Sequence, residues 1–247
     1  MNARSISVFV PVYNEEGSVR AIAEEVSRYL QAKFVDYEIL LITSEASTDG
    51  TNDIVKELKG EIPHLRAVNR GAAIGYAGAL RTGFTNATKE LIFFTDGDRQ
   101  FDINELDLLL GLIDRFDIVT GYKLKRNDPL MRIWMSWLYN ITMRWLFGLQ
   151  LRDINCAFKL YRRRVIEAVD FLPRITQGVI NIEIYLTALQ NGYTIGEIGV
   201  HHFFRLTGFT DAEIGPRGKI FAFIKPSIVW GFLKDTYMLW KKVHKGK

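Results

Sequence analysis

The chain has 247 residues, of which 48% are hydrophobic and 24% are charged, and this balance excludes a disordered or low-complexity protein. The formal net charge is +4, and the single cysteine, Cys156, cannot form an internal disulfide. No secretion signal is predicted, because the apolar run at 6–13 is short, contains Pro11 and leads into acidic residues. The longest stretch without Asp, Glu, Lys or Arg, at 184–196, is shorter than the roughly 18 residues of a spanning helix, so we predict no transmembrane segment.

The first hundred residues alternate short β-branched runs with amphipathic patterns. Strands are predicted at 6–12, 38–43, 65–68 and 91–95, and helices at 18–31, 51–58 and 75–86. Such alternation is typical of an α/β fold in which helices cover both faces of a mostly parallel sheet. Since ligands bind beyond the carboxyl ends of parallel strands, we expect the loops at 11–17, 44–51 and 96–101 to lie together at one edge of the sheet.

Beyond residue 100 the pattern is more mixed. A helix at 103–115 and a strand at 117–122 lead to a basic loop that contains Lys123 and Arg126, and Pro129 then favours the start of a helix. Four further elements are predicted after that helix: a strand at 157–161, helices at 163–169 and 180–190, and a strand at 194–200.

The predicted helix at 130–149 is apolar on almost every side. Its polar residues recur at every fourth position: Arg132, Ser136, Asn140 and Arg144. One interpretation is a buried helix whose narrow polar stripe is its solvent-exposed edge. The other is a helix in a membrane interface, with Trp134, Trp137 and Trp145 at the lipid boundary and both arginines available to anionic groups.

The segment at 211–247 is aromatic and basic. Residues 220–240 are rich in Phe and Trp but include Lys225, Lys234 and Asp235, so one or two amphipathic helices are predicted there. The lysines that follow could each add about 1 kcal/mol of attraction to an anionic membrane surface, and a solvated basic tail is the simpler alternative. The basic residues form no recognisable nucleic-acid motif, so no nucleic-acid partner is expected.

The strongest chemical signal is the sequence Asp96, Gly97, Asp98, directly after the apolar strand at 91–95. Two carboxylates one residue apart can hold a hard divalent cation together with phosphate oxygens. Asp-Gly is also common in hairpin turns, so a structural turn is the alternative for these residues alone. Their position at the end of a parallel strand favours the ligand site.

Two more polar loops follow the first and second strands. In the first, at 10–16, the Tyr13 ring could stack on a base while a carboxylate accepts its amide protons, or Asn14 could simply cap the next helix. In the second, at 47–51, a structural role as turn and helix start is sufficient.

Together, these segments resemble the family 2 glycosyltransferases of the GT-A fold, most closely the branch that transfers mannose or glucose to polyprenyl or dolichyl phosphate. The matching segments occur in the family's order: 11–16, 47–51, 69–83, 96–98, 153–162 and 202–208. The resemblance covers about residues 5–210. It implies a glycosyltransferase domain at 1–210, with a nucleotide-sugar part at about 1–122 and an acceptor part at about 123–210, followed by the tail at 211–247.

The resemblance implies a metal-dependent, inverting transfer of a hexose from a UDP- or GDP-sugar to a polyprenyl phosphate. Asp96 and Asp98 would hold Mg²⁺ or Mn²⁺ on the diphosphate, so that the nucleotide can leave. The residues that the resemblance implies for nucleotide binding are Pro11, Tyr13, Glu15, Glu45 and Asp96. Glu45 is included because Ser44, Glu45 and Ala46 stand where many relatives carry two aspartates.

The resemblance also assigns the acceptor side. Phosphates of donor or acceptor would be bound by basic residues: Lys123, Arg126, Arg132, Arg144 and Arg205. The predicted catalytic residues are Asp98 and Asp153. A lipid phosphate is already an anionic nucleophile, whereas a hydroxyl acceptor would need a base, for which Asp153 or Glu183 is the candidate.

Two other functions remain open from the sequence. The same fold could act on a saccharide or glycolipid hydroxyl, or it could serve as a non-catalytic protein that binds nucleotide sugars or membranes. Relatives often add spanning helices, and none is predicted in this chain. Attachment would therefore be peripheral, on the cytoplasmic face of the membrane, through residues 130–149 and the tail.

Overall fold

The computed structural model describes residues 4–71, 75–125, 130–205, 213–214, 223–224 and 226–245. Within them, the main sheet consists of β1 (Ile6–Pro11), β2 (Tyr37–Thr43), β3 (Leu65–Asn69), β4 (Leu91–Thr95), β5 (Ile118–Lys123), β6 (Phe158–Arg162) and β7 (Ile195–Val200). The helices are α1 (Val19–Lys33), α2 (Thr51–Glu61), α3 (Gly75–Asn86), the short 3-10 helix η1 (Ile103–Glu105), α4 (Leu106–Leu110), α5 (Leu130–Phe147), α6 (Arg163–Glu167), α7 (Val179–Gln190) and α8 (Pro226–Lys245). A small second sheet pairs β8 (Glu213–Ile214) with β9 (Phe223–Ile224).

The main sheet has the strand order β3-β2-β1-β4-β6-β5-β7. β6 runs antiparallel to both neighbours, and the other pairs are parallel, which confirms the predicted mostly parallel sheet. We call the edge at which β1, β2, β4 and β5 end the rim. Because β6 is reversed, the loop before it also lies at the rim.

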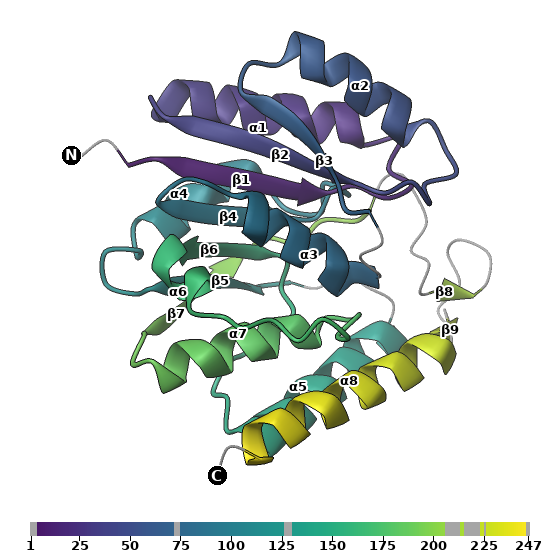
Figure 1. The fold of residues 1–247 in the computed structure, drawn as a ribbon, viewed down its shortest axis with the longest axis vertical. Helices are drawn as coiled ribbons and strands as arrows, with labels where there is room; N and C mark the ends of the chain where they lie inside the picture. The colour runs from purple at the N-terminus through teal and green to yellow at the C-terminus, as the bar shows by residue number, and fades with distance from the viewer. Residues whose placement is uncertain are drawn as a thin grey trace.

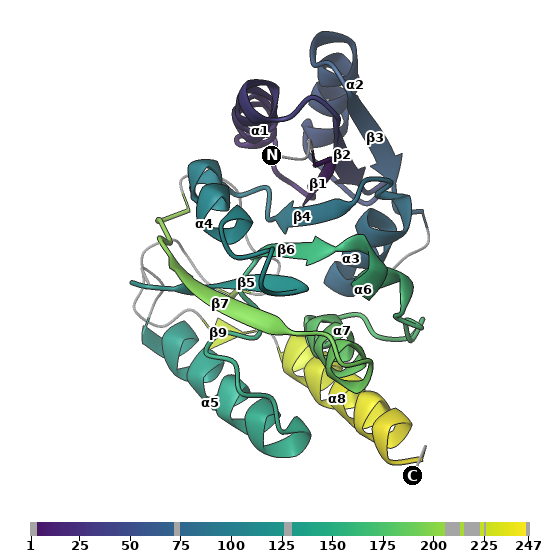
Figure 2. The same cartoon turned by 90° about the vertical axis from the view of Figure 1, so that its left-hand side faces the viewer.

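Helices cover both faces of the main sheet (Figure 1). Figure 2 shows α1 and α4 on one side and α3, α6 and α7 on the other. In both views α5 and α8 lie together at the end of the molecule beyond β7. Between these two helices the rings of Tyr139 and Phe232 meet, with centroids 5.3 Å apart.

The core is centred on the strands, which are covered on both faces. β2 and β4 are buried along their whole length, and their nearly continuous apolar sequence is typical of strands in a covered parallel sheet. α3 packs close to β1 because it is built of small residues. A Cβ atom at Gly83 would lie 2.3 Å from the Phe9 ring, so a larger residue there would push α3 away from β1.

The helix predicted at 103–115 is wrong in its length. η1 and α4 end at Leu110, and turns follow. The Asp102 carboxylate caps η1 by accepting a hydrogen bond from the Asn104 amide (2.9 Å). Gly111, which disfavours a helical conformation, stands where α4 ends. The apolar pattern of this segment therefore marks its buried side and not one continuous helix.

The segment at 220–240, for which one or two amphipathic helices are predicted, also differs at its start. Phe223–Ile224 forms β9, and α8 begins at Pro226. Proline lacks an N–H group and has a φ angle suited to a helix, so the first turn of a helix accommodates it. In the parts of the chain that the structure describes, no helix has both the length and the apolarity needed to cross a bilayer.

Candidate active site

Asp96 and Asp98 lie at the rim, directly after β4. The buried Asp98 carboxylate accepts a hydrogen bond from the Gln100 amide (3.1 Å). The Asp96 carboxylate accepts one from the Tyr76 hydroxyl (3.3 Å). Asp98 is therefore held by its own loop, and Asp96 by a side chain of α3.

The residue between them approaches the first strand closely. A Cβ atom at Gly97 would lie 2.9 Å from the carbonyl oxygen of Pro11, so this position accepts only glycine without a shift of the backbone. β4 and β5 are not neighbours in the sheet, so the segment is not a hairpin turn. The alternative of a purely structural Asp-Gly hairpin is thereby excluded.

The two carboxylates repel each other in a partly dry environment. Burial, and then the negative charge of Asp98, raises the pKa of Asp96 to about 7 against the opposing effect of the Lys123 ammonium. One pKa unit corresponds to about 1.4 kcal/mol of interaction with the charged form. A cation bound between the two aspartates would remove this repulsion.

Arg205 connects these aspartates with the loop after β1. Its guanidinium forms an ion pair with Glu15, and its Nη1 lies 3.8 Å from Asp98 Oδ2. Glu15 is also buried and accepts a hydrogen bond from the Ser18 hydroxyl (2.8 Å). Burial raises the pKa of Glu15, and the charge of Arg205 opposes that effect. One arginine thus compensates two rim carboxylates.

The segment after β7 carries Arg205 to the rim. The Phe203 amide donates a hydrogen bond to the Gln100 carbonyl (2.8 Å), and the Gln100 side-chain amide donates one to the Phe203 carbonyl (2.9 Å). This reciprocal pair ties residues 201–205 to the loop that contains Asp98. Residues 202–205 of the predicted late loop therefore reach the site through hydrogen bonds with Gln100, whereas 206–208 lie outside the described residues.

The loops after β1 and β2 hold each other in position. Asn14 adopts a left-handed conformation (φ +54°), which asparagine tolerates, and its side-chain oxygen accepts a hydrogen bond from the Thr48 amide (2.8 Å). The Asp49 carboxylate accepts hydrogen bonds from the amides of Glu16 (3.0 Å) and Thr51 (3.1 Å). In this structure the segment at 47–51 fixes the shape of the loop after β1.

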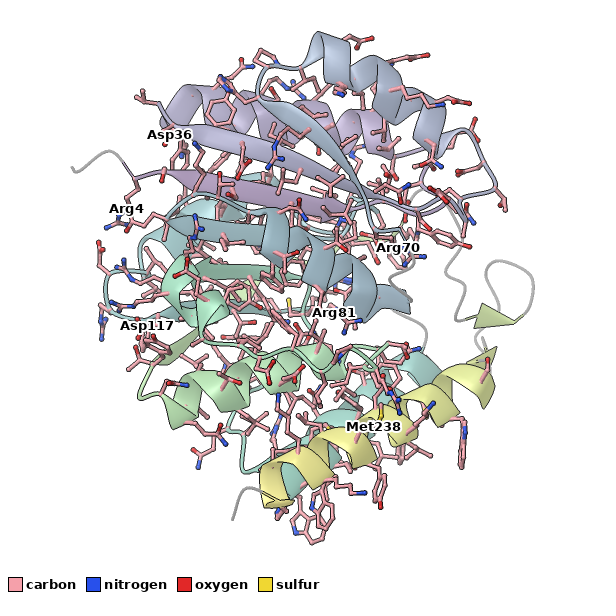
Figure 3. The ribbon with its side chains drawn as sticks, viewed as in Figure 1. Arg4, Asp36, Arg70, Arg81, Asp117 and Met238 are labelled. Carbon is pink, nitrogen blue, oxygen red and sulfur yellow. The ribbon has the colours of Figure 1, made fainter. Side chains whose placement is uncertain are left out.

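Tyr13 lies at the rim beneath the Arg70 guanidinium, which is 5.7 Å from the centroid of its ring. Arg70 also donates a hydrogen bond to the Gly75 carbonyl (2.9 Å). Figure 3 shows Arg70 at the end of the sheet where β1 ends, and Asp117 at the opposite end. Glu45 is exposed on the loop after β2, where it accepts a hydrogen bond from the Asn69 side chain (2.8 Å).

The reversed strand β6 brings Asp153 to the rim, where its side chain is buried. Behind this loop lies Lys159, which has no exposed surface and whose Nζ donates a hydrogen bond to the Ile154 carbonyl (3.0 Å). Burial lowers the pKa of Lys159 to about 8. The rings of Phe94 and Tyr185 lie 5.5 and 5.6 Å from its ammonium group.

Not every predicted site residue reaches the rim. Arg144 lies near the end of α5, beside a separate cavity. Glu183 is buried on α7, where its carboxylate accepts a hydrogen bond from Lys242 of α8 (3.2 Å). Arg126 and the side chain of Arg132 lie outside the described residues.

Three site residues were not identified from the sequence: Tyr76, Arg70 and Lys159. Tyr76 and Arg70 belong to the motif segment at 69–83, so their positions were marked but their contacts were not. Lys159 could have been recognised as a lysine inside an apolar strand. A strand covered on both faces buries all its side chains, so a lysine there is a buried charge.

An exposed apolar surface covers the outer sides of α5 and α8. It is formed by Trp134, Trp137, Leu138, Ile141 and Trp145 on α5, and by Trp230, Leu233, Tyr237 and Trp240 on α8. We call these side chains the aromatic face. Their spacing of three and four residues places each set on one side of its helix, and Trp145 is 83% exposed.

The orientation of α5 contradicts the interpretation of a buried helix with a solvent-exposed polar stripe. Asn140, a member of that stripe, is buried and accepts a hydrogen bond from the Ile154 amide (3.0 Å). Trp134, Trp137 and Trp145 are exposed instead. At this position the polar stripe faces the protein, because its side chains satisfy backbone groups of the loop before β6.

Comparison with known proteins places the chain in a family. The sequence profile of "Glycosyl transferase family 2" matches residues 7–170, more than half of the chain. The chain belongs to this family. The matched region includes the loops that carry Glu15, Asp96, Asp98 and Asp153.

Two relatives are named as polyprenyl-phosphate sugar transferases. The chain is 28% identical over 207 residues to the dodecaprenyl-phosphate galacturonate synthase of Rhizobium johnstonii, covering 82% of this chain and 60% of that protein. It is 29% identical over 167 residues to the undecaprenyl-phosphate 4-deoxy-4-formamido-L-arabinose transferase of Klebsiella pneumoniae, covering 67% and 51%. The chain thus spans between half and two thirds of the length of these relatives.

Solved structures of the glucosyl-3-phosphoglycerate synthase of Mycobacterium tuberculosis share the fold. One, with Mn²⁺, UDP and glucosyl-3-phosphoglycerate, has a TM-score of 0.62 at 20% identity and covers 82% of this chain and 73% of that one. Another, with Mn²⁺, UDP-glucose and phosphoglyceric acid, has a TM-score of 0.63 at 19% identity, with 82% and 72% covered. This likeness confirms the predicted GT-A fold.

Proposed function

We propose that this protein transfers a hexose from a nucleotide sugar to a polyprenyl phosphate, with inversion at the anomeric carbon, at the cytoplasmic face of a membrane. The observation that carries the proposal is the convergence of Glu15, Asp96, Asp98 and Arg205 at the rim, where a parallel sheet binds its ligand. The names of the two polyprenyl-phosphate relatives support the acceptor class.

The rim residues fit a divalent cation. Asp96 and Asp98 offer the oxygen ligands that Mg²⁺ and Mn²⁺ prefer, and their mutual repulsion favours a bound cation. Within the described residues, no group of three or more His, Cys, Asp or Glu side chains could hold a metal ion, so donor phosphate oxygens and water would complete the coordination. When bound, the cation would neutralise charge on the diphosphate leaving group. The Mn²⁺ and UDP complex of the solved neighbour supports this assignment.

The loops after β1 and β2 would bind the nucleoside. The Tyr13 ring and the Arg70 guanidinium form a surface on which a base can stack. Pro11 ends β1, Glu15 lies on the loop that follows, and both would contact the edge of the base. Glu45, exposed on the neighbouring loop, would take the contact to base or ribose that two aspartates make in many relatives.

The acceptor side requires phosphate binding more than proton abstraction. Lys123 and Arg205 would bind the phosphates of donor and acceptor, as cations suited to phosphate oxygens. A phosphate acceptor is anionic at neutral pH and attacks without a strong base. Asp153, buried at the rim, would then orient the acceptor. With a hydroxyl acceptor it would be the base, because Glu183 is committed to α8.

The aromatic face is the proposed attachment surface. Tryptophan and tyrosine side chains favour the headgroup level of a bilayer, and neighbouring lysines and arginines favour anionic lipids. Arg144 and Lys234 lie exposed on the same two helices. The protein would therefore lie on the membrane without crossing it.

Release of nucleoside diphosphate from a panel of UDP- and GDP-hexoses tests the reaction, with Mn²⁺ or Mg²⁺ and with or without a short-chain polyprenyl phosphate. Turnover should require both the metal and the lipid phosphate. Asp98→Asn should lower kcat at least about a hundredfold, since it removes a charge that acts on the diphosphate. Asp170→Asn is the matched control, because the Asp170 side chain is 99% exposed and lies elsewhere.

Asp153→Asn distinguishes the acceptor classes. A phosphate acceptor predicts reduced turnover with this variant, whereas a hydroxyl acceptor predicts its complete loss. Nucleotide binding that is indifferent to metal, with no turnover for any donor and either acceptor class, would contradict the proposal. That result would favour a binding protein on the same scaffold.

A further inference from the structure

A cavity of about 410 Å³ lies between the end of α5 and β7. It is lined by the loop at 148–152 together with Arg144 and Glu197. None of these lining residues belongs to the loops that carry Glu15, Asp96 and Asp98. The cavity is therefore distinct from the proposed donor site.

The loop that lines the cavity is firmly anchored. Gly148 has a φ of +69°, and its amide donates a hydrogen bond to the Arg144 carbonyl (2.8 Å), a common way for a helix to end. The side chains of Leu149 and Leu151 are buried. Between and after them, Gln150 and Arg152 are exposed. The loop thus keeps its backbone fixed while it presents polar side chains.

Two guanidinium groups border the cavity. Arg144 Nη2 donates a hydrogen bond to the Arg152 carbonyl (3.1 Å), which uses one of its five N–H donors. The Arg152 guanidinium lies 4.6 Å from the centroid of the Tyr122 ring, and this stacking fixes its plane while its edge can still donate hydrogen bonds. Paired N–H donors of this kind match the oxygens of a phosphate group.

The charge of the cavity favours an anion. Glu197 is the acidic residue in the lining, and its Oε1 accepts a hydrogen bond from the Arg152 amide (2.8 Å), so this carboxylate is used to hold the loop. Two arginines against one carboxylate leave a net charge of +1 around the cavity. A ligand with one or two negative charges would therefore be attracted.

The cavity lies beside the loop that carries Asp153. Glu197 pairs with Thr120 in the sheet, three residues before Lys123, the last residue of β5 at the rim. At about 3.3 Å per residue, Glu197 lies about 10 Å from the rim. The other wall of the cavity is nearer to the rim, because the loop at 148–152 leads directly into Asp153 and the Arg152 guanidinium contacts Tyr122, the neighbour of Lys123. Trp145, next to Arg144 in the chain, belongs to the aromatic face. The cavity is thus close to the proposed membrane surface.

We propose that the cavity between Arg144 and Arg152 binds a phosphate group outside the proposed donor site. Two sources share this chemistry: the headgroup of an anionic lipid and a free phosphate. The lipid source rests on the proposed attachment of the aromatic face to a membrane, whereas the phosphate site itself does not.

Titration of isotope-labelled protein with inorganic phosphate tests the site, with chloride at equal ionic strength as reference. The amide signals of residues 148–152 should shift and saturate. Arg144→Gln combined with Arg152→Gln should weaken this binding at least tenfold. Arg28→Gln, which removes an exposed arginine from α1, should leave it unchanged.

A second variant protects the test against local misfolding. Gln150→Glu adds a negative charge at an exposed lining position and removes no arginine, so it should also weaken phosphate binding. Absence of a saturable shift at residues 148–152 in the wild-type protein would overturn the proposal, as would binding that all these variants leave intact.

Flotation with lipid vesicles identifies the source of the phosphate. If a lipid headgroup occupies the cavity, the double arginine variant should bind phosphatidylglycerol vesicles several-fold less well than Arg28→Gln, with no difference on pure phosphatidylcholine. Equal vesicle binding together with the amide shifts would assign the site to free phosphate. Because the titration needs neither donor nor acceptor, its result stands even if no glycosyl transfer is found.

Discussion

The ammonium group of Lys159 lies in the protein interior, away from water. Its side chain has no exposed surface, and burial lowers its pKa to about 8. Since one pKa unit corresponds to about 1.4 kcal/mol, keeping the ammonium charged in the folded state costs about 3 kcal/mol relative to an unfolded lysine. The hydrogen bond to the Ile154 carbonyl offsets part of this cost. An apolar residue would pack at this position without that free-energy cost. The simplest reason for a lysine here is therefore a role beside the loop that carries Asp153.

This cost predicts a pH dependence of stability. The folded pKa lies below the unfolded value of about 10.4, so the unfolded chain binds more protons between pH 8 and that value, and wild-type stability rises with pH in this window. Lys159→Met lacks the effect. Urea unfolding should therefore show the wild type gaining about 3 kcal/mol relative to this variant between pH 7 and 10.5. Lys56→Met, whose lysine side chain is 77% exposed, should show no such gain, and a constant difference for Lys159→Met would refute the argument.

Arg205 predicts a link between stability and metal. Arg205→Gln would leave Glu15 and Asp98 without their shared counter-charge, and the metal-free protein should lose about 2 to 3 kcal/mol of unfolding free energy. Added Mn²⁺ should restore part of that loss, because a cation held by Asp96 and Asp98 supplies positive charge to one of the two carboxylates that Arg205 pairs with. Urea unfolding with and without Mn²⁺ measures both effects.

Arg20→Gln is the control for that experiment. Arg20 also bridges two carboxylates, those of Glu57 and Glu61, but on the exposed surface of α1 and α2. Exposed pairs contribute less than about 1 kcal/mol, and Mn²⁺ should have no effect on this variant. Equal losses for Arg20→Gln and Arg205→Gln would show that the Arg205 pairs are ordinary surface contacts.

Among the helices, α8 is attached to the fold partly through the buried carboxylate of Asp235. Asp235 accepts hydrogen bonds from the amides of Thr176 and Gln177, both at 2.8 Å. The Thr176 carbonyl in turn accepts a hydrogen bond from the Ala77 amide at the start of α3 (3.1 Å). α8 therefore supports the loop before α7, and through it the helix that carries Tyr76.

Removal of that carboxylate should loosen the whole element. Asp235→Ala would leave two amides without their acceptor, at a cost of about 3 kcal/mol in unfolding free energy. Hydrogen exchange at Thr176 and Gln177 should become faster. Lys234→Ala, which changes the exposed neighbour, should alter neither quantity. Unchanged exchange in Asp235→Ala would mean that the other contacts of α8, among them the Lys242–Glu183 pair, hold this helix in place.

The elements also show which features of the fold local sequence patterns can predict. β1, β2 and β4 were predictable because a strand covered on both faces needs a continuous apolar run, and the Asp96 and Asp98 site followed from the end of β4. The reversal of β6 was not predictable, since direction depends on partners distant in the chain. For the same reason the sequence marked Arg205 as a phosphate ligand but could not show its ion pairs with rim carboxylates.

On the scale of the whole molecule, the two helices that carry the aromatic face, α5 and α8, also begin on the side where the rim lies. In Figure 1, α5 and α8 both begin on the side of the molecule where β1 ends. α5 starts a few residues after Lys123, the end of β5 at the rim. A membrane that contacts the outer sides of these helices would therefore lie close to the rim, and a lipid phosphate could reach Asp98 without leaving the headgroup region.

This arrangement predicts that one tryptophan from each helix contributes to membrane binding. Trp145 and Trp230 are 83% and 71% exposed, so each would transfer most of its surface from water to lipid. Burial of a large apolar side chain is worth about 1.5 to 3 kcal/mol, and 1.4 kcal/mol is a factor of ten in affinity. Trp145→Gln combined with Trp230→Gln should thus lower the partition coefficient onto anionic vesicles at least a hundredfold, measured by flotation.

The control for this prediction is Val35→Gln, which replaces another exposed apolar side chain, located after α1 and away from the aromatic face. It should bind vesicles like the wild type. The single variants should each lose about tenfold if both helices contact the same bilayer. If only one of them weakens binding, the contact is made by one helix, and the rim does not face the membrane as proposed. If neither does, the aromatic face serves another partner, and the route of the lipid phosphate to Asp98 must lie elsewhere.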